Sequence, residues 1–175
     1  ENMLENLLMN RRSTRKFTDK KVEAEKIQAI VKGALTSPSG NNLKPSEIIV
    51  VENSETLIRL GDARGKASKL IGGAPLAFVV IGDTKKSTTW LSDTAIMATI
   101  IQLLAEEQGL KSCWVHVENR VADNGSNVEE NIKGILDIPS HYTPHCIIAI
   151  GYPAEDKRPY TEKDLDYTRV HRERF

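Results

Sequence analysis

The chain is short of cysteine, of aromatic residues and of net charge, and each shortage excludes a class of protein. Only two cysteines, Cys113 and Cys146, occur in 175 residues, too few for a disulfide framework or a cysteine-rich metal site. Lys and Arg total 24, as do Asp and Glu, so the basic excess typical of nucleic-acid binders is missing. With aromatic residues at 5%, aromatic stacking platforms for single-stranded nucleic acid are not expected either.

Long apolar runs are missing too. No segment approaches the ~20 apolar residues of a membrane span, and the first residues lack the basic and apolar regions of a signal peptide. We therefore expect a cytoplasmic protein without a membrane, nucleic-acid or metal partner. The length predicts a single domain over residues 1–175, with room for a sizeable core.

Hydrophobic spacing predicts helices that alternate with four apolar strands. Apolar residues three and four positions apart predict helices over 3–10, 23–35, 90–108 and 128–136, and another from Leu57 that continues through Lys69. Runs of apolar and β-branched residues predict strands over 46–51, 76–82, 110–117 and 145–151. This order predicts an α+β or α/β domain layered around a central sheet.

Two further segments suggest contacts between subunits. The helix over 90–108 is apolar on more than one face, which is typical of a core helix or of a subunit interface. Trp90 and Asp93 are expected to begin or cap this helix. From Pro153 onwards the chain has too few apolar residues for a core of its own, so we expect it to wrap around something else, such as a second subunit.

Two polar segments are candidates for binding. Residues 11–17, Arg-Arg-Ser-Thr-Arg-Lys-Phe, contain four cations and two hydroxyls, and guanidinium and hydroxyl groups bind phosphate well. The alternative is a solvated charged run. Residues 36–45 contain two Pro, one Gly, two Asn and two Ser, which predicts either an ordinary turn or a loop whose amides bind the edge of a polar ring.

Gly72 and Gly73 do not form the GxGxxG pattern of a dinucleotide site.

Taken in order, these motifs resemble the FMN-dependent nitroreductase family. The matching segments are 11–17, 37–45 (Ser-Pro-Ser-Gly-Asn-Asn-Leu-Lys-Pro), 109–115 (Gly-Leu-Lys-Ser-Cys-Trp-Val) and 150–153 (Ile-Gly-Tyr-Pro). The resemblance implies an α+β fold, a three-layer α/β/α sandwich with a central, mostly antiparallel sheet. It also implies an obligate homodimer with two FMN sites between the subunits, and a domain-swapped tail over 153–175.

The resemblance also implies an activity and a set of site residues. The activity is FMN-dependent NAD(P)H oxidation that reduces nitroaromatics, quinones or similar small acceptors by ping-pong hydride transfer, with NADH or NADPH as co-substrate. The alternative is a non-catalytic or differently specialised flavin-binding homologue. Because a flavin carries the hydride chemistry itself, no catalytic side chain is expected. The implied cofactor contacts are Arg11, Arg12, Ser13 and Arg15 for the phosphate and ribityl chain, the partner subunit's loop Pro38, Ser39, Gly40, Asn41 and Asn42 for the ring, and Trp114, Val115 and His116 for its N5/O4 side.

Some positions depart from the family pattern. Lys44 stands where the family often has Gln, Ser46 where it often has an aromatic residue, and His116 where it often has a small or acidic one. Either Lys44 or Lys69 is a candidate for the cation near the N1/O2 edge of the flavin. For the cation from the C-terminal tail that helps to hold the phosphate, Lys163, His171 and Arg172 are equal candidates.

Overall fold

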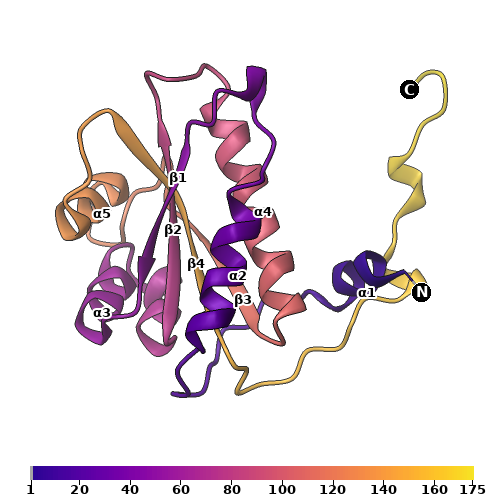
Figure 1. Ribbon diagram of the computed structural model, residues 1–175, viewed down its shortest axis with the longest axis horizontal. Helices are drawn as coiled ribbons and strands as arrows, with labels where there is room; N and C mark the ends of the chain where they lie inside the picture. The colour runs from indigo at the N-terminus through magenta and orange to yellow at the C-terminus, as the bar shows by residue number, and fades with distance from the viewer. Residues whose placement is uncertain (1) are drawn as a thin grey trace.

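The fold is built on one antiparallel sheet, seen in a computed structural model that describes residues 2–175 (Figure 1). Its strands are β1 (Ser46–Val51), β2 (Leu76–Asp83), β3 (Lys111–His116) and β4 (Tyr142–Gly151). They lie in the order β1-β2-β4-β3, and every neighbouring pair is antiparallel. The predicted antiparallel sheet is therefore confirmed, with β1 and β3 as its edges.

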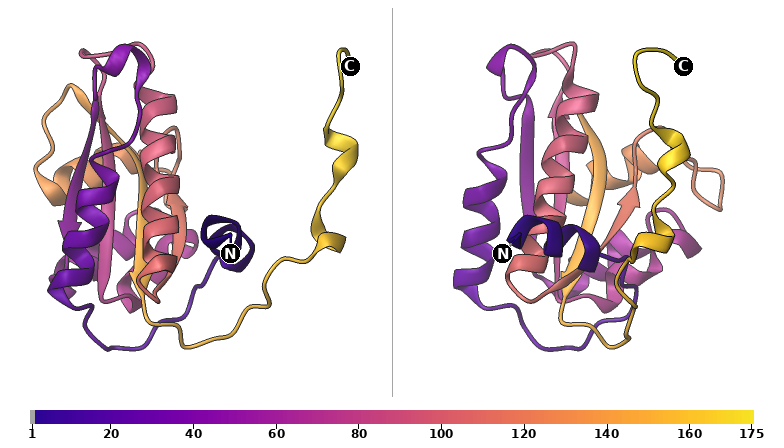
Figure 2. Two further views of the ribbon diagram at one scale, coloured as in Figure 1. Left: turned by 45° about the vertical axis from the view of Figure 1, so that its right-hand side comes forward. Right: turned by 90° about the vertical axis from the view of Figure 1, so that its right-hand side faces the viewer.

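Helices cover both faces of the sheet, which confirms the predicted three layers (Figures 1 and 2). On one face lie α2 (Ala24–Ala34) and α4 (Trp90–Glu107), and on the other lie α3 (Ser54–Asp62), the 3₁₀ helix η2 (Lys66–Gly73) and α5 (Val128–Leu136). The remaining helices of the described chain are α1 (Met3–Asn10), η1 (Gly40–Asn42), η3 (Glu162–Asp164) and η4 (Tyr167–Arg169).

The central strand β2 shows why a continuous apolar run was needed. Successive side chains of a strand point to opposite faces, so a strand covered on both faces must be apolar at every position. Three of its side chains enter the core under α2 and α4: Leu76, Phe78 and Val80. Three others enter the core under α3 and α5: Ala77, Val79 and Ile81.

The helix predicted from Leu57 through Lys69 is interrupted, and this part of the prediction was wrong. Helix α3 ends at Asp62, and Gly65 takes a positive φ of 107° before the 3₁₀ helix begins. The hydroxyl of Ser68 donates to Gly61 O at 2.7 Å and accepts from the backbone N–H of Arg64 at 3.1 Å. A serine that bonds nearby backbone groups in this way competes with regular helical bonding.

Strand β4 begins at Tyr142, three residues earlier than predicted. The register shifts between Val80 and Ile81 of β2, so that Cys146 pairs with Val80 and Pro144 pairs with Ile81. His145 is thereby left as the extra residue of a β-bulge. A proline is compatible with a strand at such a bulge, which is why Pro144 does not end it.

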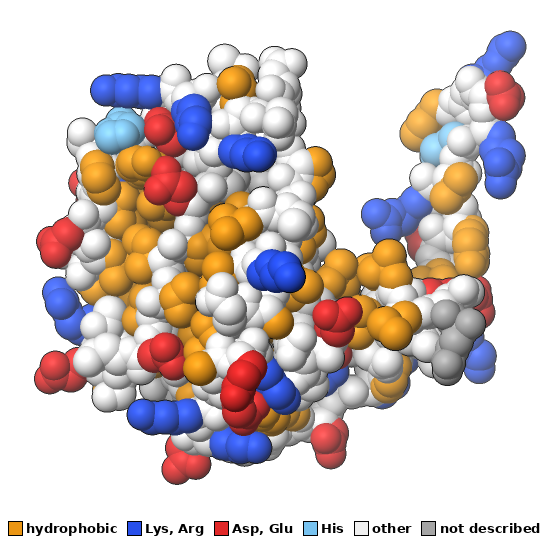
Figure 3. All heavy atoms as spheres, viewed as in Figure 1, with side chains coloured by type: hydrophobic (Ala, Val, Ile, Leu, Met, Phe, Trp, Pro, Cys, Tyr) orange, Lys and Arg blue, Asp and Glu red, His pale blue; other side chains and the backbone are white. Residues whose placement is uncertain are grey.

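Helix α1 and the tail after β4 form an arm that extends away from the rest of the chain (Figures 1 and 2). Helix α1 has no buried residue, and Leu4 is 60% exposed. The backbone N–H of Tyr160 donates to Met9 O at 2.8 Å, which joins the tail to α1. Figure 3 shows an open gap between the ascending tail and the rest of the chain. The exchange of this tail between subunits stays a prediction.

None of the helices in residues 2–175 combines the length and the apolar composition needed to cross a membrane.

Replacing Gly82 by Ala should destabilise the fold. A Cβ at Gly82 would lie 2.6 Å from Cε3 of Trp90, at the start of α4, and a rigid indole must shift to admit it. We expect a loss of about 1–3 kcal/mol in the free energy of unfolding, measured by urea titration. The matched control is Gly134→Ala in α5, where a Cβ meets nothing within 4 Å. This control should be neutral or stabilising by about 0.5–1 kcal/mol, and equal losses in both variants would contradict the packing argument.

Candidate functional site

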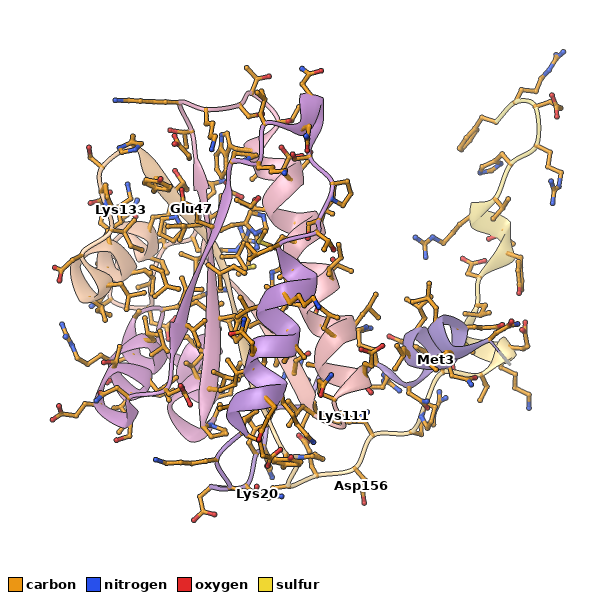
Figure 4. All side chains as sticks on the ribbon, viewed as in Figure 1. Met3, Lys20, Glu47, Lys111, Lys133 and Asp156 are labelled. Carbon is orange, nitrogen blue, oxygen red and sulfur yellow. The ribbon has the colours of Figure 1, made fainter. Side chains whose placement is uncertain are left out.

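The basic segment 11–17 lies along the outer edge of β3. The backbone N–H of Thr14 donates to Ser112 O at 3.0 Å, and Ser13 forms a parallel bridge with Ser112. Thr14 is buried, at 1% exposure, so its side chain anchors the segment. Lys111 Nζ donates to Asn10 O at 3.3 Å from the start of β3 (Figure 4). These contacts fix the backbone of the segment and leave its cationic side chains to the outside.

The guanidinium groups of this segment have no acidic partner. Within residues 2–175, none of Arg11, Arg12 and Arg15 forms an ion pair. Arg12 Nη1 donates to Arg158 O at 2.6 Å, and its guanidinium lies 4.7 Å from the centre of the Tyr160 ring. The arm therefore orients Arg12 through a carbonyl and a ring, which leaves its positive charge uncompensated.

The nearby carboxylate of Glu155 contacts the backbone of the segment instead. The N–H of Arg15 donates to Glu155 Oε2 at 3.1 Å, and this bond holds the pKa of the carboxyl below its ordinary value. Lys157 Nζ lies 3.5 Å from Glu155 Oε1. Glu155 thus helps to fix the position of Arg15 without pairing with its guanidinium.

The edge of β3 is open next to these cations. Alternate residues of an antiparallel strand turn their backbone groups to opposite sides. Ser112 O is bonded by Thr14, and His116 O accepts from Arg64 Nη1 at 3.0 Å, so Trp114 between them also faces outward. In the described chain, the outward carbonyl of Trp114 receives only a long contact from Cys113 Sγ, 3.9 Å away.

Val115 differs from its two neighbours in the predicted set. Its side chain is 4% exposed and lies in the core under α3 and α5. Trp114 and His116 lie together on the other face, with ring centres 6.3 Å apart. Val115 turns its backbone groups towards β4, so neither its side chain nor its backbone is available to a ligand at this outer edge.

Trp114, His116 and Glu118 form a hydrogen-bonded chain. Trp114 Nε1 donates to His116 Nδ1 at 3.2 Å, and His116 Nε2 lies 3.3 Å from Glu118 Oε1. Because the indole can only donate, Nδ1 of His116 must accept, so the ring proton lies on Nε2 and points to Glu118.

His145 is a buried histidine that the sequence did not single out for this site. It is 3% exposed, and its Nδ1 has no hydrogen-bond partner in the described residues. Its ring stands nearly perpendicular to those of Trp114 and His116, with centres 5.6 and 5.0 Å away. Burial, followed by the neighbouring His116, lowers the pKa of His145 to about 4, against a smaller raising effect of Glu118. The ring is therefore neutral at neutral pH.

The second polar segment forms a strained loop at the N-terminal end of α4. Asn41, Asn42 and Lys44 have positive φ angles of 52°, 54° and 51°, an uncommon conformation for residues other than glycine. The backbone N–H of Gly40 donates to Asp93 Oδ1 at 3.1 Å. Trp90 begins α4 as predicted, but Asp93 binds this loop instead of capping the helix. The side-chain amides of Asn41 and Asn42 are exposed, and within residues 2–175 they form no hydrogen bond.

The two segments lie at opposite ends of α4. Gly40 is bonded to Asp93 in the first turn, whereas Lys111, which reaches Asn10, binds Glu106 in the last turn at 2.9 Å. At 1.5 Å per residue these two turns are about 20 Å apart. The chain therefore holds the basic segment at the Lys111 end of β3 and places the loop 38–42 at the other end of α4.

The candidate cations lie in several parts of the chain, and their roles stay predictions. Lys69 is tied to Asp62, and Lys44 lies in the distant loop. Arg64, which the sequence analysis did not select, reaches the edge of β3. The proposed tail cations share no hydrogen bond or ion pair with residues 11–17 in the part of the chain that the structure describes: Lys163, His171 and Arg172.

The chain is thus an α+β protein, an α/β/α sandwich that displays guanidinium groups without acidic partners beside an open strand edge. Comparison with known sequences narrows this class to one family. A sequence model described as the nitroreductase family matches residues 8–67 and 62–152. The chain is accordingly a member of the nitroreductase family, as its motifs suggested.

Individual relatives agree with this assignment. An FMN-dependent nitroreductase from Clostridium difficile R20291 has a solved structure that is 44% identical, with a TM-score of 0.94 over 97% of this chain and 98% of that one. A protein of Methanothermobacter thermautotrophicus, provisionally named NADH dehydrogenase/NAD(P)H nitroreductase, is 33% identical over 96% of this chain and 85% of its own. The FMN reductase (NADPH) of Bacillus subtilis is 26% identical, over 91% of this chain and 70% of its own.

Stability should fall in mild acid because His145 is buried without charge. The unfolded chain takes up a proton near the ordinary pKa of 6.5, whereas the folded chain does so only near 4. The stabilising contribution is thus complete above pH 6.5 and is lost as the pH falls towards 4, by about 3 kcal/mol in total.

The test is urea unfolding of wild type and His145→Leu across this pH range. The variant should show a flatter loss of stability, while His171→Leu, at an exposed histidine, should follow the wild-type slope. Parallel slopes for wild type and His145→Leu would contradict the assignment.

Proposed function

We propose that this protein is an FMN-dependent NAD(P)H oxidoreductase that reduces nitroaromatic, quinone or similar acceptors in a ping-pong sequence. The observation that carries the proposal is the set of guanidinium groups without acidic partners beside the open edge of β3. The printed names of the relatives support it, because they include an FMN-dependent nitroreductase and an FMN reductase that uses NADPH.

The basic segment fits a phosphate group. Arg11, Arg12 and Arg15 supply guanidinium donors, and the Ser13 hydroxyl, which forms no hydrogen bond within the described residues, supplies a neutral one. Charge-assisted bonds of this kind are short and strong, and guanidinium groups bind two oxygens at once. Arg12 is already oriented by Arg158 O and the Tyr160 ring, so less conformational entropy is lost on binding.

The open edge of β3 fits the polar rim of a planar ring. The outward backbone groups of Trp114 offer one acceptor and one donor, and Arg64 lies at the end of this edge through its bond to His116 O. A fixed cation here stabilises negative charge that develops nearby. When bound, FMN would supply the hydride chemistry between NAD(P)H and the acceptor, so the protein's tasks are to bind, orient and exclude water.

The site is completed by a second copy of the chain. The loop 38–42 is about 20 Å from the basic segment of its own chain, beyond the reach of a phosphate held there, and we assign it to the site of another subunit. Helix α1 has no buried residue, and an apolar hollow lies on the exposed face of α4, lined by Ala95, Ile96, Thr99 and Ile100. A second subunit in the gap of Figure 3 would cover these apolar surfaces.

The proposed function is tested by spectroscopy and turnover. The purified or FMN-reconstituted protein should show the visible absorbance bands of oxidised flavin. It should also oxidise NADH or NADPH when a nitroaromatic or a quinone is present, with parallel lines in double-reciprocal plots. Flavin binding without NAD(P)H oxidation would favour the non-catalytic alternative, and a protein that cannot be loaded with FMN would contradict both.

The phosphate assignment predicts a specific loss of affinity. Arg15→Ala should weaken FMN binding by roughly 1.5–3 kcal/mol, because it removes charge-assisted hydrogen bonds. Quenching of flavin fluorescence measures the dissociation constant. The control Lys32→Ala removes the same charge from the exposed end of α2 and should leave the affinity unchanged. Equal affinities in both variants would mean that residues 11–17 are only a solvated charged segment.

A further inference from the structure

Asp93 is a buried carboxylate without an ion-pair partner among residues 2–175. It is 3% exposed, and no ion pair includes it. Both of its oxygens are nevertheless bonded, because Gly40 N–H donates to Oδ1 at 3.1 Å and the Thr89 hydroxyl donates to Oδ2 at 2.9 Å. Burial of a carboxylate is unfavourable unless such bonds compensate for the lost water. Asp93 thus couples the first turn of α4 to the backbone of the loop.

Gly40 is the residue through which Asp93 holds the loop. It directly precedes Asn41, the first of the residues with positive φ. Backbone conformations of this kind cost about 1–3 kcal/mol each and persist only where the surroundings impose them. Gly40 also packs closely on Thr89, since a Cβ on it would lie 2.3 Å from Thr89 Oγ1. Ser87 Oγ, 2.9 Å from the same hydroxyl, holds Thr89 in place.

We propose that Asp93 is a positioning residue that fixes the loop 38–42 for contact with the flavin of the other subunit. The proposal rests on the proposed function. A hydrogen bond to a carboxylate is stronger than one to a neutral group, so the bond to Gly40 N–H immobilises the backbone at the start of the strained run. The free amides of Asn41 and Asn42 are then presented in one geometry. On the proposed assembly, in which this loop contacts the flavin of the other subunit, Asp93 acts on the partner's site and not on its own.

Affinity and stability separate this role from a merely structural one. Asp93→Ala should weaken FMN binding by about tenfold or more, whereas Asp93→Asn, whose amide oxygen can still accept from Gly40 N–H, should stay within about threefold of wild type. The control is Thr94→Val, which removes hydroxyl bonds to Trp90 O and Leu91 O in the same turn without touching the loop. It should lower the melting temperature of the flavin-free protein and leave FMN affinity unchanged. Flavin fluorescence quenching and thermal unfolding provide the two measurements.

Mixed dimers test whether Asp93 acts across the interface. One chain carries Arg15→Ala and the other, with a different affinity tag, carries Asp93→Ala. If the loop of each chain serves the other's site, one site has both defects and the other has neither. The mixed dimer should then bind about half the wild-type amount of FMN with wild-type affinity, while each mutant homodimer binds weakly. If Asp93 served its own chain's site, every site would carry one defect and no tight binding would return.

Gly40→Ala extends the test should Asp93→Ala fail to fold, because its Cβ displaces the exposed loop from Thr89 and leaves Asp93 in place. It should reproduce the loss of affinity and the recovery in mixed dimers. Two results would overturn the role of Asp93, provided that the wild-type protein binds FMN. One is an FMN affinity of Asp93→Ala and Gly40→Ala that equals that of Thr94→Val. The other is a mixed dimer that has no tight FMN site. A wild-type protein that binds no FMN instead overturns the proposed function, and the role of Asp93 with it.

Discussion

The hydrogen bond from Thr14 N–H to Ser112 O determines where the positive charge of this protein lies. It attaches the segment after α1 to the free edge of β3, so the cationic side chains gather beside unpaired strand backbone. The rest of the arrangement follows from this attachment. The arm crosses the segment and orients Arg12, and Glu155 binds the backbone of Arg15 and not its guanidinium. A chain without net charge thereby acquires a local concentration of positive charge.

The sheet makes that edge available. β2 and β4 are covered on both faces over their apolar stretches and occupy the centre of the sheet, which leaves β3 at an edge. Exposed strand edges usually attract further pairing. Here the edge is blocked at Ser112 by Thr14 and at His116 by Arg64. The short open piece at Trp114 is what the proposed cofactor would use.

The sheet and most helices could be predicted because their signals are local. Periodic apolar residues specified α1 and α5 to the residue, and β2 to within one. The failures have causes that the spacing of apolar residues does not reveal. The end of α3 depends on the Ser68 hydroxyl, and the start of β4 depends on a bulge against β2. The resemblance to the nitroreductase family pointed to those parts of the candidate site that lie within the family's sequence motifs. Arg64 and His145 were missed, and Asp93 was expected only to begin or cap α4, because each acquires its place through contacts between segments distant in sequence.

The arm has a consequence for how the protein would behave on dilution. On the proposed assembly, each flavin contacts two chains, so flavin binding and subunit association reinforce each other by mass action. Helix α1, which buries no residue within its own chain, would contribute little to folding until a partner arrives. The fraction of protein that carries cofactor would then rise with protein concentration even at a constant excess of flavin.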